Sequence, residues 1–154
     1  MLTPEDRIKS NPSIEQYKTY VKRKIDGIYY LVNYALFKKV PLITAKDSLC
    51  IKAVKLLDNG DCLELNISAD HPNCPVQPTI DRIVTIQNPI YYKKTPEGLS
   101  VQSFNYIIPR TNVGMIFLKP LLNNIYQGTL KRILEIIKTE PLDLETIESQ
   151  FNQQ

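Results

Sequence analysis

Most of the chain before residue 109 has the hydrophobic pattern of short β-strands. The run Ile28–Val32 is rich in β-branched and aromatic residues, and the turn sequence Asp26-Gly27 separates it from an earlier segment that contains Tyr17 and Val21. Such runs on either side of an Asp-Gly turn are typical of a β-hairpin. The short turns between segments indicate an antiparallel meander of about six strands. The further strands are predicted at residues 48–57, 62–69, 80–93 and 99–108.

The predicted strand at residues 62–69 alternates strictly between apolar and polar side chains. Alternation of this kind is the pattern of a sheet with one side against a core and the other in solvent. We therefore expect the polar side of this strand to face water. The apolar side carries Leu63, Leu65 and Ile67, and the polar side carries Glu64, Asn66 and Ser68.

After Arg110 the hydrophobic period changes to that of a helix. Apolar residues recur every three or four positions from about Leu118 to Lys138, and Pro120 is suited to the first turn of such a helix. Gly128 inside the segment marks either a bend or a close approach to the sheet. The apolar stripe consists of Leu118, Leu122, Ile125, Thr129, Ile133 and Ile136.

A curved sheet packed on one long C-terminal helix is the simplest way to bury this stripe, so the sequence predicts an α+β domain. Where the sheet and the helix do not touch, the gap between them would be an apolar cavity suited to a lipid-like ligand. The stripe residues Leu122, Ile125, Thr129 and Ile133 are therefore candidate ligand contacts.

The composition is that of one folded domain. The chain has 154 residues, of which 43% are hydrophobic and 23% are charged, values that are typical of globular proteins. Its 19 basic and 16 acidic side chains give a formal net charge of +3, which is far less basic than a nucleic-acid-binding domain. The N-terminus lacks the basic and apolar regions of a signal peptide, so we expect a cytoplasmic protein.

The chemistry-bearing residues are few. Cys50, Cys62 and Cys74 form no CxxC pair and are odd in number, so a disulfide framework or a zinc site is not expected. His71 is the only histidine and lies in a proline-rich segment, where a structural hydrogen bond is favoured over catalysis. Asp70, His71 and Cys74 carry no nucleophile motif, and we expect no enzymatic activity.

Several segments together resemble a known family. The segment Pro41–Lys52 is similar to a P-L-S-x-R-D-[FY]-V-x-x-R element, and Ser68–Pro75 followed by Asp81-Arg82 is similar to an S-x-x-H-P-x-x-P stretch and the strand that follows it. Asn11-Pro12 resembles the end of a W-[DN]-P element, and Phe104–Pro109 resembles a closing strand. These are elements of START domains, the lipid-transfer modules related to the steroidogenic acute regulatory protein.

The resemblance covers residues 7–139 and leaves 140–154 as a tail. It implies a helix-grip fold, in which a curved antiparallel sheet wraps around a C-terminal helix and encloses one sterol, phospholipid or other hydrophobic molecule. It also implies lipid transfer between membranes without a cofactor. The alternative is an interaction or regulatory module that keeps the grip fold but encloses no ligand.

The chain also departs from the family pattern. START domains carry a helix and three strands upstream of the region that matches, so the resemblance implies a truncated domain. In the family those strands pair beside the last strand, and residues 99–108 would therefore form an open edge. There are two alternatives to truncation. The open edge pairs with a partner, or the chain folds as a reduced helix-grip domain whose cavity is open on one side.

The resemblance also suggests a polar anchor. Lys52 matches a family arginine that projects into the tunnel, and Asn33 stands where the acidic partner of that arginine is expected. A lysine facing an amide would bind the polar end of a lipid directly or through water. The alternative is that Lys52 extends into solvent.

The remaining lysines are grouped in short clusters. Most such clusters are solvated surfaces, and here they would also allow transient contact with an anionic membrane during ligand exchange. No aromatic stacking motif accompanies them, so no nucleic acid is expected as a partner. The clusters are Lys22-Arg23-Lys24, Lys38-Lys39, Lys93-Lys94 and Lys131-Arg132.

Overall fold

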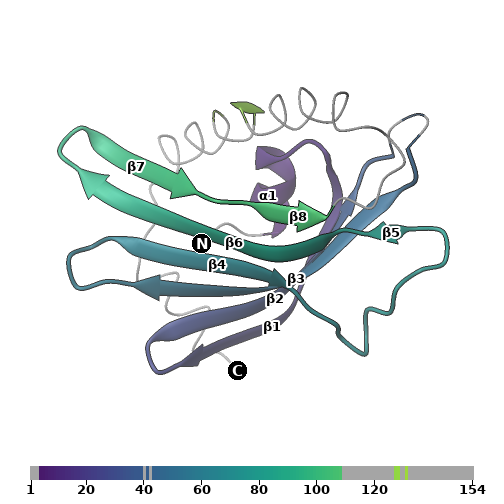
Figure 1. The fold of residues 1–154 in the computed structure, drawn as a ribbon, viewed down its shortest axis with the longest axis horizontal. Coiled ribbons are helices and arrows are strands. Elements are labelled where there is room, and N and C mark those ends of the chain that lie inside the picture. Colours follow the sequence, from purple (N-terminus) through teal and green to yellow (C-terminus); the bar gives the residue numbers. More distant parts are fainter. Residues whose placement is uncertain (1–3, 40, 42, 109–126, 129–130, 132–154) are drawn as a thin grey trace.

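The computed structural model describes residues 4–39, 41, 43–108, 127–128 and 131 (Figure 1). This part of the chain begins with one short helix and continues as a sheet of eight strands. The elements are α1 (Pro4–Ser10), β1 (Ile14–Ile25), β2 (Ile28–Phe37), β3 (Lys46–Leu56), β4 (Cys62–Ser68), β5 (Asp81–Arg82), β6 (Val84–Thr95), β7 (Gly98–Ser103) and β8 (Tyr106–Ile108).

The strands follow one another in the order β1-β2-β3-β4-β6-β7, and every neighbouring pair in this series is antiparallel. The predicted antiparallel meander is therefore confirmed. Two predicted strands are each divided in two. The strand predicted at residues 80–93 corresponds to β5 and β6, and the strand predicted at residues 99–108 corresponds to β7 and β8. The short β5 pairs with β3 in parallel, which the sequence pattern did not indicate, and β8 pairs with β6.

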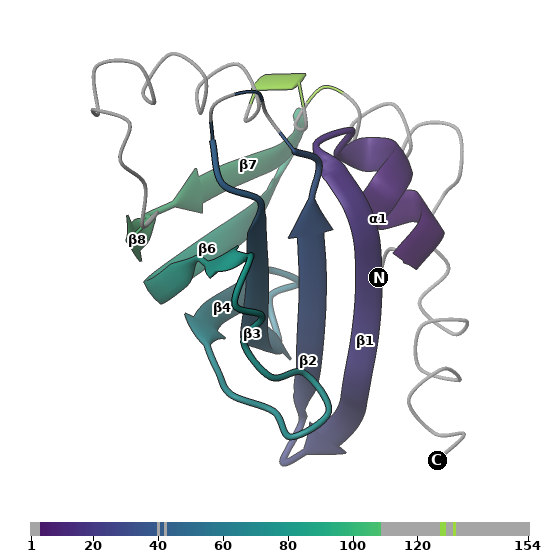
Figure 2. The ribbon, with the colours of Figure 1, turned by 90° about the vertical axis from the view of Figure 1, so that its right-hand side faces the viewer.

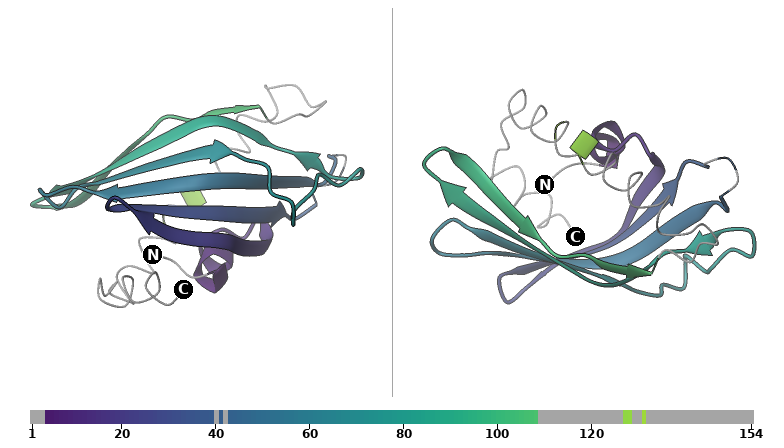
Figure 3. Two further views of the ribbon diagram at one scale, coloured as in Figure 1. Left: turned by 90° about the horizontal axis from the view of Figure 1, so that it is seen from below. Right: turned by 45° about the horizontal axis from the view of Figure 1, so that its top comes forward.

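The helix α1 was not expected from the hydrophobic pattern, although its ends carry ordinary helix signals. Pro4 begins it, Glu5 and Asp6 lie in its first turn, and basic residues lie in its last turn, an arrangement that suits the helix dipole. It ends where the amide of Asn11 donates a hydrogen bond to the carbonyl of Arg7. Figure 2 shows α1 beside β1, and Figure 3 shows it on the concave side of the curved sheet.

The strand β4 is oriented opposite to expectation. Its alternate side chains Leu63, Leu65 and Ile67 are 44%, 41% and 37% exposed, whereas the side chain of Glu64 is only 11% exposed. The polar side of β4 therefore faces the buried side of the sheet, and its apolar side faces water. The physical reason is that a buried lysine on β3 supplies the counter-charge for Glu64, so the carboxylate need not reach solvent.

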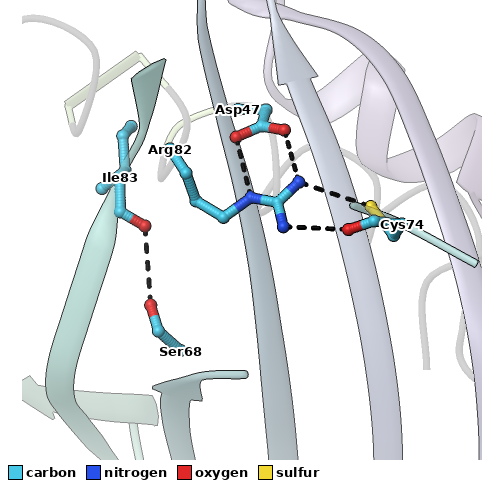
Figure 4. Close-up of polar contacts among 5 residues, drawn as sticks. All are labelled: Asp47, Ser68, Cys74, Arg82 and Ile83. Atoms are coloured by element: carbon cyan, nitrogen blue, oxygen red, sulfur yellow. Dashed lines mark hydrogen bonds and ion pairs between the residues drawn. The ribbon is translucent and has the colours of Figure 1, made fainter. Parts of the chain in front are cut away.

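A buried ion pair fastens the link between β4 and β5 to the sheet (Figure 4). The guanidinium of Arg82 donates to both carboxylate oxygens of Asp47, at 3.1 and 2.8 Å, and to the carbonyl of Cys74 at 3.0 Å. Asp47 is fully buried and Arg82 is 7% exposed. Asp47, Cys74 and Arg82 come from three different segments that resemble the START family, and the structure brings them together in one contact. The Asp47 carboxylate also raises the pKa of Arg82.

The last strands form an open edge within the described residues. There, β7 and β8 each pair with β6 alone, and Leu99, Val101 and Phe104 are 51%, 43% and 60% exposed. An unpaired row of backbone groups at this edge agrees with the expectation for residues 99–108.

The predicted C-terminal helix falls almost entirely outside the described residues. Gln127, Gly128 and Lys131 are helical. The stripe residues Leu118, Leu122, Ile125, Thr129, Ile133 and Ile136 lie outside the described part, so the packing of that helix stays a prediction. A Cβ added at Gly128 would meet no described atom within 4 Å.

Across the described ranges, no helix combines the length and apolarity needed to cross a membrane.

Asp61 ties the β3–β4 turn to β6, and its environment predicts a pH dependence. Its carboxylate accepts hydrogen bonds from the Tyr91 hydroxyl, from the amide of Lys94 at 2.9 Å and from the side chain of Asn59 at 2.9 Å. The Tyr91 bond, followed by the Lys94 amide, lowers the pKa of Asp61. A lowered carboxyl pKa stabilises the folded state above the ordinary pKa of aspartate, and this stabilisation is lost as the pH falls below it.

Asp61→Asn should therefore lower stability at pH 7 and show a weaker fall in stability between about pH 5 and pH 3 than the parent chain. Urea unfolding across this pH range measures both effects. Asp58→Asn in the same turn is the control for the loss of one carboxylate. An Asp61→Asn profile parallel to that of the parent chain would contradict the assignment.

Candidate functional site

The candidate site is built around a buried ion pair on one face of the sheet. The ammonium group of Lys52 on β3 lies 2.7 Å from a carboxylate oxygen of Glu64 on β4. Lys52 is paired across the strands with Leu31 and Asn66, so Glu64 lies diagonally from it on the same face. The two side chains are 9% and 11% exposed. Lys52 therefore does not extend into solvent.

This face is the concave, inner side of the sheet. The helix α1 lies on the concave side (Figure 3), and the charge of Arg7 on α1 affects the pKa values of Lys52, Glu64 and Tyr92. The ion pair therefore lies on the concave side of the sheet, the side on which α1 lies (Figure 3).

Burial and the attraction between Lys52 and Glu64 shift the pKa values of these two groups in opposite directions. Burial lowers the pKa of Lys52, and the positive charge of Arg7 lowers it further, while Glu64 opposes both. Burial raises the pKa of Glu64, but the charge and hydrogen bond of Lys52 and the bond from Asn66 bring it below the ordinary value. The Lys52 side chain therefore favours the charged form of Glu64 on the inner face. Burial and the Glu64 carboxylate also raise the pKa of Tyr92.

Asn33 does not face Lys52 as its amide partner. It is buried, and its side-chain oxygen accepts a hydrogen bond from the Thr19 hydroxyl on β1 at 2.9 Å. The expected pairing of Lys52 with Asn33 is thus corrected: the carboxylate partner stands on β4 instead of β2. Both residues still lie on the same face of the sheet, because Asn33 pairs with Cys50 two positions from Lys52.

A row of polar residues continues from the ion pair across the inner face. Lys52 pairs with Asn66, and Asn66 pairs with Asn88 on β6. The side chain of Asn66 donates to Glu64 at 2.9 Å. The side-chain oxygens of Asn88 and Asn105 are both buried and have no hydrogen-bond partner in the described part of the chain.

Apolar side chains lie next to this polar row. Tyr29 and Leu31 on β2 are 5% and 4% exposed and form a core cluster against which Val54 packs. Leu31 is directly opposite Lys52, and Tyr29 is directly opposite Val54. The inner face thus combines an apolar wall with a short line of polar groups, the arrangement that fixes the orientation of an amphiphilic ligand.

The other chemistry-bearing residues have structural contacts. The ring of His71 stacks on Tyr20 with centroids 5.0 Å apart, and its Nδ1 atom accepts a hydrogen bond from the amide of Asn73 at 3.2 Å. Cys50, Cys62 and Cys74 are free thiols. No group of three or more metal-ligating side chains occurs among the residues that the structure describes.

Sequence reasoning found Lys52 and Asn33 but missed Glu64, Asn66, Asn88 and Asn105. A signal for Glu64 was present in the sequence. Pairing the two predicted strands on either side of the turn at residues 57–61 places Glu64 opposite Val54 and diagonal to Lys52. The four predicted helix contacts Leu122, Ile125, Thr129 and Ile133 lie outside the described residues. Whether any of these side chains touches a lipid stays a prediction.

The fold is that of START domains. Human STARD10 superposes with a TM-score of 0.67 at 18% identity, over 90% of this chain and 58% of that one. Human StAR-related lipid transfer protein 5 gives a TM-score of 0.71 at 14% identity, over 86% and 64%. The lipid transfer and protein localization domain of human StarD13 (DLC2) gives 0.66 at 15% identity, over 88% and 66%.

The chain therefore has a START-like fold and spans about three fifths to two thirds of the length of these solved domains. No protein-family model and no curated protein matches the sequence.

Proposed function

We propose that the chain binds a single lipid of the phospholipid or sterol class on the inner face of its sheet and transfers it between membranes. The START-like fold supports this function, since the solved proteins of this fold include ones described as lipid transfer proteins. The observation that carries it to this chain is the buried Lys52–Glu64 pair beside the apolar cluster of Tyr29 and Leu31.

The proposal includes binding without catalysis and without a cofactor, in the cytoplasm. The contacts of His71 support the first part, because its ring stacks on Tyr20 and its Nδ1 atom accepts a hydrogen bond from the backbone of Asn73. Transient contact of the lysine clusters with anionic membranes is the proposed step that precedes ligand exchange.

The test is transfer of a fluorescent phospholipid or sterol between donor and acceptor vesicles. Lys52→Met combined with Glu64→Gln removes both charges together, so that neither is left alone in the core. We expect this double variant to keep its fold and to transfer lipid several times more slowly, because the inner face loses the charged part of the polar row that orients the ligand.

The matched control is Lys93→Glu with Lys94→Glu, two exposed positions at the β6–β7 hairpin. This control changes membrane attraction and leaves the inner face intact. Transfer unchanged in the double variant but abolished in the control would show that docking limits the function and that Lys52 is not a ligand anchor. Native mass spectrometry that finds no lipid on the chain under any loading condition would favour the interaction-module alternative.

A further inference from the structure

The polar row on the inner face ends in two acceptors for which the described part of the chain supplies no donor. Ile90 pairs with Ser103 and Gln87 with Tyr106, and this common register brings Asn88 opposite Asn105. The amide of Phe104 donates to the carbonyl of Pro89 at 3.1 Å, in agreement with that register. Two unpaired side-chain oxygens therefore lie on neighbouring segments of one sheet.

Buried acceptors of this kind are uncommon in folded proteins. A buried carbonyl oxygen loses its hydrogen bonds to water on folding, and it destabilises the fold unless a donor reaches it. Two such oxygens lie together on the face proposed to hold a ligand, and neither has a donor within the described residues. A bound ligand can supply that donor.

The charges nearby restrict the chemistry of that donor. Lys52 and Glu64 neutralise each other, and the Asn66 side chain already donates to Glu64. The Asn88 and Asn105 oxygens are the negative ends of amide dipoles, so they repel a phosphate or carboxylate and attract a hydroxyl hydrogen.

We propose that Asn88 and Asn105 bind the free hydroxyl group of a neutral lipid. This inference rests on the proposed lipid-binding function and names the class of lipid: a sterol or a diacylglycerol, both of which carry one hydroxyl on an apolar body. The hydroxyl donates to one of the amide oxygens, and the apolar body lies along the wall formed by Tyr29 and Leu31.

The first experiment uses the parent chain alone. Native mass spectrometry measures competition between cholesterol and its 3-methyl ether, and between dioleoylglycerol and its acetate. Each pair differs in the hydroxyl donor and keeps the oxygen atom. We expect the hydroxyl form of at least one pair to bind about tenfold or more tightly than the capped form. The pair that shows this preference distinguishes a sterol from a diacylglycerol.

The second experiment uses Asn88→Leu and Asn105→Leu. Each variant removes an unpaired buried oxygen, so its thermal unfolding midpoint without lipid should be unchanged or higher, whereas a residue with a structural hydrogen bond would lose stability. In at least one of the two variants the preference for the hydroxyl form should fall to about twofold or less, because the donor no longer has its acceptor. Asn73→Leu, in an exposed position of the link before β5, is the control and should keep the full preference.

Two results would overturn the inference. Equal binding of hydroxyl and capped lipids by the parent chain would remove the need for a donor, whatever the variants do. Undiminished preference in both leucine variants would place the hydroxyl elsewhere. Binding of dioleoylphosphatidylcholine alone would leave the proposed function standing and reject this inference, whereas failure to bind any lipid would reject both.

Discussion

Glu64→Gln is expected to destabilise the folded chain by about 3–5 kcal/mol, the usual effect of removing one partner from a buried ion pair. The Lys52 side chain, which is 9% exposed in the parent chain, would then face an amide in place of the carboxylate, with the positive charge of Arg7 nearby. Equilibrium unfolding in urea measures this loss. The replacement of both partners by Lys52→Met and Glu64→Leu should cost far less, because no charge is then left alone in the core.

The direction of the pH dependence follows from the lowered pKa of Lys52. A lysine whose pKa is lower in the folded state loses its proton there at a lower pH than in the unfolded chain. The free energy of unfolding therefore rises with pH between the pKa of the folded-state lysine and that of the unfolded-state lysine. Without Glu64 the pKa of Lys52 falls further, and the deficit of Glu64→Gln should shrink between pH 7 and pH 10. A deficit that is constant over this range would mean that the charge on Lys52 is not its cause.

The strand meander could be predicted from the sequence because its signals are local. The Asp26-Gly27 turn and the runs of β-branched and aromatic residues are each contained within a few positions of the chain, and the resemblance of Ser68–Pro75 and Asp81-Arg82 to START domains pointed to the same fold. The helix α1 also had local signals in Pro4 and Glu5, but its seven residues are too few for an apolar stripe to be recognised.

The site could be predicted only in part, because burial in a curved sheet depends on partners that are distant in sequence. The alternation in β4 defined two faces correctly, but which face is inner depends on the Lys52 charge from β3 and on the curvature of the whole sheet. Asn33 was assigned as the partner of Lys52 from a family position. The structure instead satisfies Asn33 with Thr19, a residue that no sequence motif connected to it.

Asp47→Asn is the second change with a large expected effect, also about 3–5 kcal/mol, because it leaves the Arg82 guanidinium buried beside an amide. Arg82 holds the link between β4 and β5 through the Cys74 carbonyl, so the damage should extend to that link. We expect the thiol of Cys74, a residue that is 7% exposed in the parent chain, to react much faster with a maleimide in this variant. Intact mass measured over time after mixing gives the rate.

Asp81→Asn is the matched control, since the Lys46–Asp81 pair has almost the same length, 2.7 Å against 2.8 Å for Arg82–Asp47, and lies on the same two strands. The Asp81 side chain is 43% exposed and the Asp47 side chain is fully buried. An exposed pair contributes only about 0–1 kcal/mol, because water solvates both partners when they separate. If the two variants lose equal stability, burial is not what makes the Asp47–Arg82 contact strong. If Asp47→Asn leaves the Cys74 rate unchanged, the link before β5 is held in place by other contacts.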